Sequence, residues 1–162
     1  DAEGERSPAD GKTKYAHSRS YLGWDPVSAA LEEVSPGRRA IASFPELPVA
    51  LADYSQDADV TAELVDVGGG AEASDYAGKD VKGKFVLSSG STGAVYALAT
   101  QRGDNGVLGI SAIGYQRAVD FPNQIVWSTV NAAPGTVAWS VTPAVQHKHQ
   151  AHSTRGARLT IR

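Results

Sequence analysis

The most informative hydrophobic pattern in the chain begins with a short apolar run and continues into a segment of helical spacing. Residues Phe85–Leu87 are apolar and are followed by Ser and Gly, which is typical of a strand buried on both faces. A turn rich in serine and glycine comes next, in which Ser91 or Thr92 can cap a helix. The predicted helix carries apolar residues on one face, at Val95, Leu98 and Ala99.

The end of this helix and the next apolar run complete a strand–helix–strand unit. Arg102 falls in the last turn, and Gly103 is placed to end the helix in a left-handed conformation. Residues Val107–Ile110 predict a second buried strand. Because so few residues separate the two strands, the unit predicts a right-handed parallel crossover. It is the only part of the sequence for which we expect parallel pairing.

Several further short strands are predicted elsewhere in the chain. Apolar and polar positions alternate in three segments, at Val60, Ala62 and Leu64, at Val137, Trp139 and Val141, and at Ala157, Leu159 and Ile161. Residues 30–34 and 125–130 predict two more strands, the first closed by the turn Ser35–Gly37. Residues 41–51 carry two prolines and predict an extended connection or an edge strand. Thr142 and Pro143 predict the start of a second helix that continues to Ser153.

Together these elements predict a strand-rich α/β fold of about seven short strands and two edge helices, with one strand–helix–strand crossover. Residues 1–20 are rich in charge, Gly, Ser and Pro, so we expect a flexible tail. Residues 21–58 are predicted to form a lead-in strand with an extended connection, and residues 59–162 the main domain.

Composition excludes several classes of protein. The 162 residues are 41% apolar and carry a net charge of −3 with both signs interspersed, so we expect no nucleic-acid or membrane partner. No apolar run approaches the roughly 20 residues that span a bilayer. The absence of cysteine excludes disulfides, thiolate zinc sites and cysteine nucleophiles. The absence of methionine implies that the chain begins downstream of a translation start.

Three motifs, in their order and spacing, resemble those of a known family. They are Val65-Asp-Val-Gly-Gly-Gly, Asp75-Tyr-Ala-Gly-Lys-Asp-Val-Lys-Gly-Lys-Phe-Val-Leu, and Arg102-Gly followed by Gly106-Val-Leu. This series resembles the protease-associated domain that is inserted in secreted zinc aminopeptidases of the M28 class. The upstream segments Gly23-Trp-Asp-Pro and Pro48-Val-Ala-Leu-Ala-Asp-Tyr-Ser are similar to the lead-in of such peptidases, so the resemblance covers residues 24–162.

The resemblance implies a fold and a function. The fold would be an open barrel or sandwich of strands with helices at its edges. The domain would lie against the catalytic domain of an extracellular or periplasmic metallo-aminopeptidase, influencing substrate entry or the binding of a peptide or protein. Zinc would belong to that adjoining catalytic domain, and this chain alone would hold no cofactor and hydrolyse nothing.

The residues that would bind zinc in such a peptidase are not found in this chain. The M28 class carries a His-x-Asp motif and a Glu-Glu pair, but this sequence contains no His-x-Asp. Its one Glu-Glu pair, Glu32 and Glu33, has no histidine nearby in sequence, and we expect a solvated strand edge there. His149 and His152 share a face if their segment is helical, while His147 points away. With no acidic residue from 143 to 162, the two are weak candidates for adventitious metal.

Two loops are candidate binding surfaces. The first is the turn before the predicted helix, formed by Ser88, Ser89, Gly90, Ser91, Thr92 and Gly93. Its backbone amides suit an anion, but it lacks the Gly-Lys-Ser/Thr ending of a phosphate loop, and a tight capped turn explains it as well. The second loop offers mixed polar and aromatic groups for a partner, at Tyr115, Arg117 and Phe121.

Two functions from other classes stay open beside the protease-associated domain. One is a serine-type hydrolase that uses Ser88, Ser89 or Ser91 with a distant His and Asp, because triads assemble in space rather than in sequence. The Gly-x-Ser-x-Gly elbow of many hydrolases is not present. The other is a free-standing interaction domain with no peptidase attached.

Overall fold

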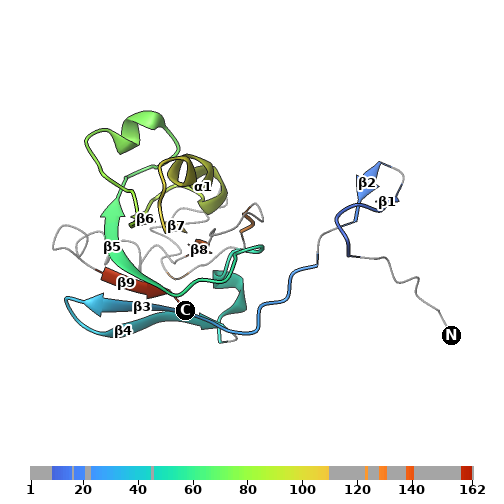
Figure 1. Cartoon of the computed structure of the whole chain (residues 1–162), viewed down its shortest axis with the longest axis horizontal. Helices are drawn as coiled ribbons and strands as arrows, with labels where there is room; N and C mark the ends of the chain where they lie inside the picture. Colours follow the sequence, from blue (N-terminus) through green and yellow to red (C-terminus); the bar gives the residue numbers. More distant parts are fainter. Residues whose placement is uncertain are drawn as a thin grey trace.

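The structure is a computed structural model that describes residues 9–15, 17–20, 23–44, 46–109, 123, 128–130, 138–140 and 158–161. Figure 1 shows a main body built around one sheet, with a small N-terminal hairpin standing away from it. In the described part of the chain, no helix has the length and apolar character that a membrane crossing requires.

The described strands of the body form one mixed sheet. In chain order they are β3 (Ala29–Ser35), β4 (Arg39–Phe44), β5 (Val60–Asp66), β6 (Phe85–Leu87), β7 (Gly106–Gly109), β8 (Ala138–Ser140) and β9 (Arg158–Ile161). Their order in the sheet is β4-β3-β9-β5-β6-β7-β8. The predicted strand-rich α/β class is confirmed, and the described strands form an open sheet rather than a closed barrel. The second predicted helix, at residues 142–153, lies outside the described residues, as does most of the strand predicted at 125–130.

The predicted strand–helix–strand unit is confirmed. Helix α1 (Thr92–Gln101) connects β6 to β7, and these two strands pair in parallel with Val86 opposite Val107. Ser91 is the N-cap, and its hydroxyl accepts a hydrogen bond from the Ala94 amide at 3.4 Å. Gly103 follows the helix with φ of 75°, the left-handed conformation that glycine adopts without strain.

Parallel pairing extends beyond this unit, so the expectation that it would be confined there was wrong. β5 pairs in parallel with β6, and β7 pairs in parallel with β8. The connection from β5 to β6 contains the short 3-10 helix η2 (Ala73–Tyr76). It returns the chain to the end of the sheet at which β5 begins, so that β6 runs in the same direction. An alternating pattern identifies a strand but does not reveal its neighbour or its direction, which is why the sequence missed these pairs.

The other half of the sheet is antiparallel. β9, the last strand in sequence, lies between β3 and β5, with Leu31 opposite Ile161 on one side and Ala62 opposite Leu159 on the other. The prediction of an edge strand within residues 41–51 is confirmed by β4, which ends at Phe44 and is followed by the 3-10 helix η1 (Pro48–Ala50). Strands from residues 21–58 and from residues 59–162 are therefore neighbours in one sheet.

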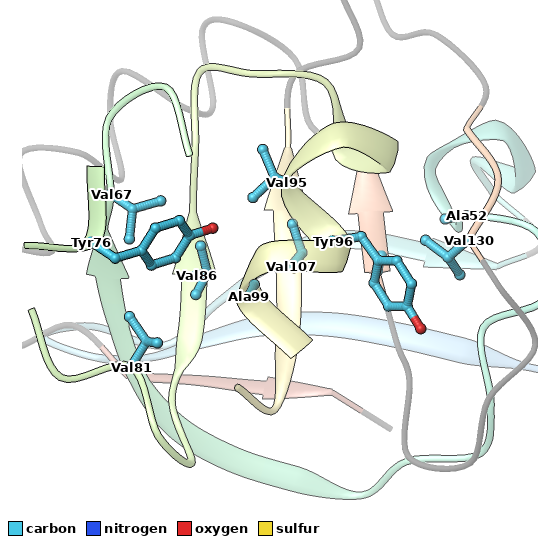
Figure 2. Packing of buried hydrophobic residues seen from close by; sticks show 11 residues of the cluster. Ala52, Val67, Tyr76, Val81, Val86, Val95, Tyr96, Ala99, Val107 and Val130 are labelled. Carbon is cyan, nitrogen blue, oxygen red and sulfur yellow. The ribbon is translucent and has the colours of Figure 1, made fainter. Parts of the chain in front are cut away.

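Buried apolar side chains form two clusters, one on each face of the sheet. β6 contributes to both, because Phe85 and Leu87 belong to one cluster and Val86 to the other, and all three are fully buried. Helix α1 covers the second cluster, which Figure 2 shows with Val95 and Ala99 packed above the sheet. The first cluster is formed by Leu31, Ala50, Leu51, Ala62, Leu64, Phe85, Leu87 and Leu108.

The segment that precedes β5 covers the edge strand β8. The Ala52 amide donates to the Ala138 carbonyl at 3.0 Å, and the Ser55 hydroxyl bonds to both the amide and the carbonyl of Ala138. The indole of Trp24 in turn donates to the Ser55 carbonyl at 3.0 Å. The two segments that resemble a peptidase lead-in, around Trp24 and Ser55, thus come together at this edge.

The N-terminal tail contains a local structure that its composition did not predict. Strands β1 (Lys14–Tyr15) and β2 (Ser18–Arg19) form a two-stranded hairpin. The Asp10 carboxylate accepts hydrogen bonds from the Ser20 and Thr13 hydroxyls and from two backbone amides. These bonds, that from Ser20 foremost, hold the pKa of Asp10 well below its usual range. The flexibility of residues 1–20 stays a prediction.

Candidate functional site

The turn Ser88–Gly93 lies at the carboxyl end of β6, between that strand and α1. The turn Gly68–Gly70, which follows β5, lies beside it. Because β5, β6 and β7 are parallel, their carboxyl ends meet at one edge of the sheet, where ligands bind in many open α/β folds. The position of the turn therefore suits a binding surface, and its chemistry depends on what its side chains contact.

The three serine hydroxyls of this turn are bonded to backbone groups. Ser88 is fully buried, and its hydroxyl lies 3.4 Å from the Gly90 carbonyl. Ser89 donates to the Gly68 carbonyl twice, from its amide at 2.8 Å and from its hydroxyl at 3.1 Å. Ser91 caps the helix. These contacts support the conformation of the turn and join it to the glycine-rich turn after β5.

Two glycines allow the turns to approach each other closely. A Cβ atom on Gly90 would overlap the Gly69 carbonyl oxygen, so no larger residue fits there without moving backbone. Gly70 has φ of 71°, and a Cβ at that position would lie 3.0–3.1 Å from Val95, Ser88 and Val67. The geometry at these glycines is a tight contact between the two turns.

The start of α1 is packed against β7 in a similar way. Thr92, the first residue of the helix, is fully buried. A Cβ atom on Gly109 would lie only 2.6–2.8 Å from Thr92 atoms. The glycine therefore allows the first residue of the helix to pack directly against the strand. Among the described residues of the two turns and the helix start, Gly69, Ser89, Ser91 and Gly93 are exposed and form a small polar surface.

The other predicted site residues lie outside the described part of the chain. Tyr115, Arg117 and Phe121 fall in residues 110–122, and His149 and His152 fall in residues 141–157. Their roles stay predictions. Within the described residues, no group of three or more His, Cys, Asp or Glu side chains is placed to hold a metal ion. The residues described here thus do not fit a zinc centre.

The prediction that Glu32 and Glu33 form a solvated strand edge was wrong for Glu33. The Glu33 side chain is only 3% exposed, although Glu32 is partly exposed and pairs with Arg38 at 3.4 Å. β3 is paired on both sides, with β4 and with β9, so it is not an edge strand. Alternation places the two adjacent glutamates on opposite faces, and Glu33 shares its face with Leu31, which is fully buried in the first cluster.

Sequence analysis missed a polar cluster at the carboxyl end of α1. The Arg102 guanidinium lies 4.4 Å above the Tyr76 ring and donates to the Leu98 carbonyl at 2.8 Å. The Tyr76 hydroxyl donates to the Gly70 carbonyl at 3.0 Å. Burial raises the pKa of Tyr76, while the Arg102 charge acts in the opposite direction. No local pattern signals this contact, because 26 positions separate the two residues in the sequence.

Asp104 follows the same helix end and is partly buried. Its carboxylate accepts a hydrogen bond from the Gly106 amide at 3.1 Å, and the neighbouring Asn105 amide side chain donates to the Gly83 carbonyl at 2.7 Å. Burial raises the pKa of Asp104 from its ordinary value of 3.8 to about 6. The two polar residues thus shape the turn into β7.

We predict a pH-dependent effect of the substitution Asp104→Asn. A carboxyl group whose pKa rises on folding contributes to the stability of the fold. This contribution is fully present below pH 3.8 and is lost as the pH rises through about 6. At pH 7.5 the Asn variant should therefore be more stable than the parent by about 1–2 kcal/mol, after allowance for solvent screening. At pH 4 the two should be similar. Urea unfolding at both pH values checks this.

The control for that measurement is Asp57→Asn, which changes an exposed carboxylate and should alter the free energy of unfolding little at either pH. Equal stabilisation by Asp104→Asn at pH 4 and pH 7.5 would contradict the assignment, because it would show that charge burial is not the cause.

Comparison with known proteins identifies solved structures of similar fold. No family model and no curated protein matches the sequence. Among solved structures, the aminopeptidase from Aneurinibacillus sp. strain AM-1 is similar with a TM-score of 0.64 at 21% sequence identity. BSAP, a zinc aminopeptidase from Bacillus subtilis, is similar with a TM-score of 0.59 at 17% identity. The chain shares its fold with part of these aminopeptidases.

Each match covers a much larger share of this chain than of the aminopeptidase chain. Both cover 86% of this chain but only 31% of the aminopeptidase chain, so this chain spans about a third of their length. The similarity is to one portion of a larger enzyme.

Proposed function

We propose that this chain is a non-catalytic protease-associated domain of a longer zinc aminopeptidase. The observation that carries the proposal is that most of this chain matches a minor part of two aminopeptidase chains. The reactive zinc and its ligands would belong to the rest of the polypeptide, which acts outside the cell or in the periplasm. The domain would govern substrate access or bind a peptide or protein.

Two features of the chain itself support this proposal. The sequence contains no His-x-Asp motif, and the described residues hold no three-ligand group for a metal. The serines of the turn Ser88–Gly93 have hydroxyls bonded to backbone groups. The backbone-bonded hydroxyls suit a scaffold, which is the role that we propose.

The contact surface of the proposed domain is the carboxyl edge of the parallel strands. Ser89 and Ser91 are exposed there, and the predicted contact residues Tyr115, Arg117 and Phe121 follow the end of β7 in the sequence. Exposed hydroxyl and backbone groups suit hydrogen bonds to an extended peptide. We assign peptide contact to this edge as part of the proposal.

The proposal is tested by measuring hydrolysis. The purified 162-residue chain, with zinc added, should not cleave leucine p-nitroanilide, whereas the longer protein read from the full coding frame should cleave it. Robust metal-dependent hydrolysis by the 162 residues alone would contradict the non-catalytic role. A coding frame that ends at Arg162 would favour a free-standing interaction domain instead.

The serine-hydrolase alternative has its own test. It requires a base within hydrogen-bond reach of a serine hydroxyl, about 2.6–3.2 Å. In the described residues the one histidine is His17, on the N-terminal hairpin. The proposed scaffold role predicts that a serine-directed fluorophosphonate leaves the chain unlabelled. Stoichiometric labelling at Ser88, Ser89 or Ser91 would overturn the scaffold role.

A further inference from the structure

The turn between α1 and β7 contains an asparagine followed by a glycine, Asn105-Gly106. Of the three asparagines in the sequence, Asn105 is the one that a glycine follows. An asparagine can deamidate because the backbone nitrogen of the next residue can attack its side-chain carbonyl carbon. Glycine has no Cβ to hinder that approach. Among the asparagines, Asn105 is therefore the one most open to spontaneous loss of its amide group.

The reaction needs water as its one co-reactant. A base removes the proton of the Gly106 amide, and the nitrogen forms a bond to the Asn105 side-chain carbonyl carbon. The bond from that carbon to Nδ2 breaks, and the departing nitrogen takes up the proton and leaves as ammonia. Water then opens the cyclic imide at either carbonyl, which gives aspartate or isoaspartate at position 105. Nothing is oxidised or reduced.

In the folded chain both reacting nitrogens are hydrogen-bonded. The Gly106 amide donates to the Asp104 carboxylate at 3.1 Å, and the Asn105 Nδ2 donates to the Gly83 carbonyl at 2.7 Å. The Asp104 carboxylate is ionised at pH 7.5, above its pKa of about 6, and its negative charge opposes removal of the Gly106 proton. Gly106 is also buried where β7 begins, opposite Phe85. The attack on Asn105 is therefore disfavoured while the turn is closed.

Backbone hydrogen bonds to the segment before β6 hold this turn closed. The Asn105 amide donates to the Lys84 carbonyl at 2.8 Å, and the Gly83 amide donates to the Gly103 carbonyl at 2.7 Å. Gly83 and Gly103 have φ of 67° and 75°, the left-handed conformation that suits glycine. A local separation of the two segments would free the Asn105 side chain and let the backbone at Gly106 rearrange, without unfolding of the whole sheet.

We propose that Asn105 is a site of spontaneous deamidation and that opening of the turn at residues 103–106 controls its rate. An aspartate at position 105 places a carboxylate where a donor to the Gly83 carbonyl stood, next to the Asp104 carboxylate in sequence. An isoaspartate adds an atom to the backbone immediately before β7, which disturbs the pairing of Gly106 with Phe85. Either product loosens the connection between α1 and β7.

The test measures aspartate and isoaspartate at position 105 by peptide mapping, after incubation of the 162-residue chain at pH 7.5. We expect the folded chain to be modified at least about 10-fold more slowly than the same chain unfolded in urea. Hydrogen–deuterium exchange of the Asn105 amide, which donates to the Lys84 carbonyl, reports opening of the same turn and should show protection of similar size.

Gly103→Ala should speed modification of the folded chain roughly 5-fold or more, because the left-handed conformation is strained for alanine. The added Cβ itself meets only the Lys82 side chain, at 3.6 Å. The matched control is Gly37→Ala, at a glycine with no positive φ and no atom within 4 Å of its Cβ, and it should leave the rate at Asn105 unchanged.

The substitution Asn105→Asp reproduces one product directly. It should lower the ratio of folded to unfolded chain roughly 2- to 10-fold at pH 7.5, through loss of the bond to Gly83. Equal modification rates in the folded and the unfolded chain overturn the role of the turn, and an Asn105 that stays intact in urea overturns the site itself. If Gly103→Ala does not fold, low urea concentrations replace it: rates of exchange and modification in the parent that do not rise together overturn the proposal.

Discussion

Replacing Phe85 by alanine is expected to lower the free energy of unfolding by about 3–5 kcal/mol. Phe85 is fully buried at the start of β6, which pairs with β5 on one side and β7 on the other. Truncation removes the largest of the fully buried side chains and leaves a cavity against Leu64 and Leu87, which are held by the surrounding sheet and cannot collapse into it. Urea unfolding followed by tryptophan fluorescence measures the loss.

The matched control is Val27→Ala, since Val27 is 94% exposed and its truncation should change stability by less than about 0.5 kcal/mol in the 162-residue chain. A loss below about 1 kcal/mol for Phe85→Ala would contradict the central position of β6, because so small a value is typical of surface sites. If the loss caused by Phe85→Ala exceeds the total free energy of unfolding, the variant will be unfolded without denaturant.

The second large effect is expected from Gly90→Ala, which should destabilise the fold by about 2–3 kcal/mol. The added Cβ would overlap the Gly69 carbonyl oxygen and would lie 3.2 Å from the Val95 side chain. Because the obstacle on one side is backbone, the two turns must separate, and the hydrogen bond from the Ser89 amide to the Gly68 carbonyl should lengthen or break. Thermal or urea unfolding checks the magnitude.

Gly37→Ala provides the comparison for this substitution. No atom lies within 4 Å of a Cβ at Gly37, and this glycine does not have positive φ, so alanine should be neutral there or slightly stabilising. If Gly90→Ala proved as harmless as Gly37→Ala, the turns would not be packed together, and Ser88–Gly93 would again be open to a role in anion binding.

The serine- and glycine-rich turn shows how one short motif supports both structure and a proposed surface. Ser88 and Gly90 face inward and hold the turn against Gly68–Gly70, while Ser89 and Ser91 remain exposed although each also makes a backbone bond. A substrate or partner would therefore meet hydroxyls whose directions are already set. This arrangement lowers the entropy lost on binding, which is the physical reason for placing contact at this edge.

The local part of the fold was predictable from the sequence. The apolar run Phe85–Leu87, the cap at Ser91 and the glycine at Gly103 each act within a few residues, and each is confirmed. The strands at Val60–Asp66 and Arg158–Ile161 were likewise indicated by alternation. For the candidate site, the sequence located the turn Ser88–Gly93 but did not reveal that its hydroxyls bond to backbone.

Three features depended on contacts between segments that lie far apart in the chain. Glu33 is buried on the same face of β3 as Leu31, which packs in a cluster with side chains from segments as distant as β6 and β7. Packing between such distant segments leaves no trace in the local pattern. The contact of Arg102 with Tyr76 arises because the connection after β5 crosses the same face of the sheet as α1. The parallel direction of β5 also comes from that crossover.

The sequence by itself located helix α1 and most described strands of the body, since hydrophobic period, capping and turn residues act over short distances. Only the tertiary structure decided which strands are neighbours and which glutamate is buried. Those features depend on the burial of two apolar faces by distant segments, and that burial is a property of the whole fold.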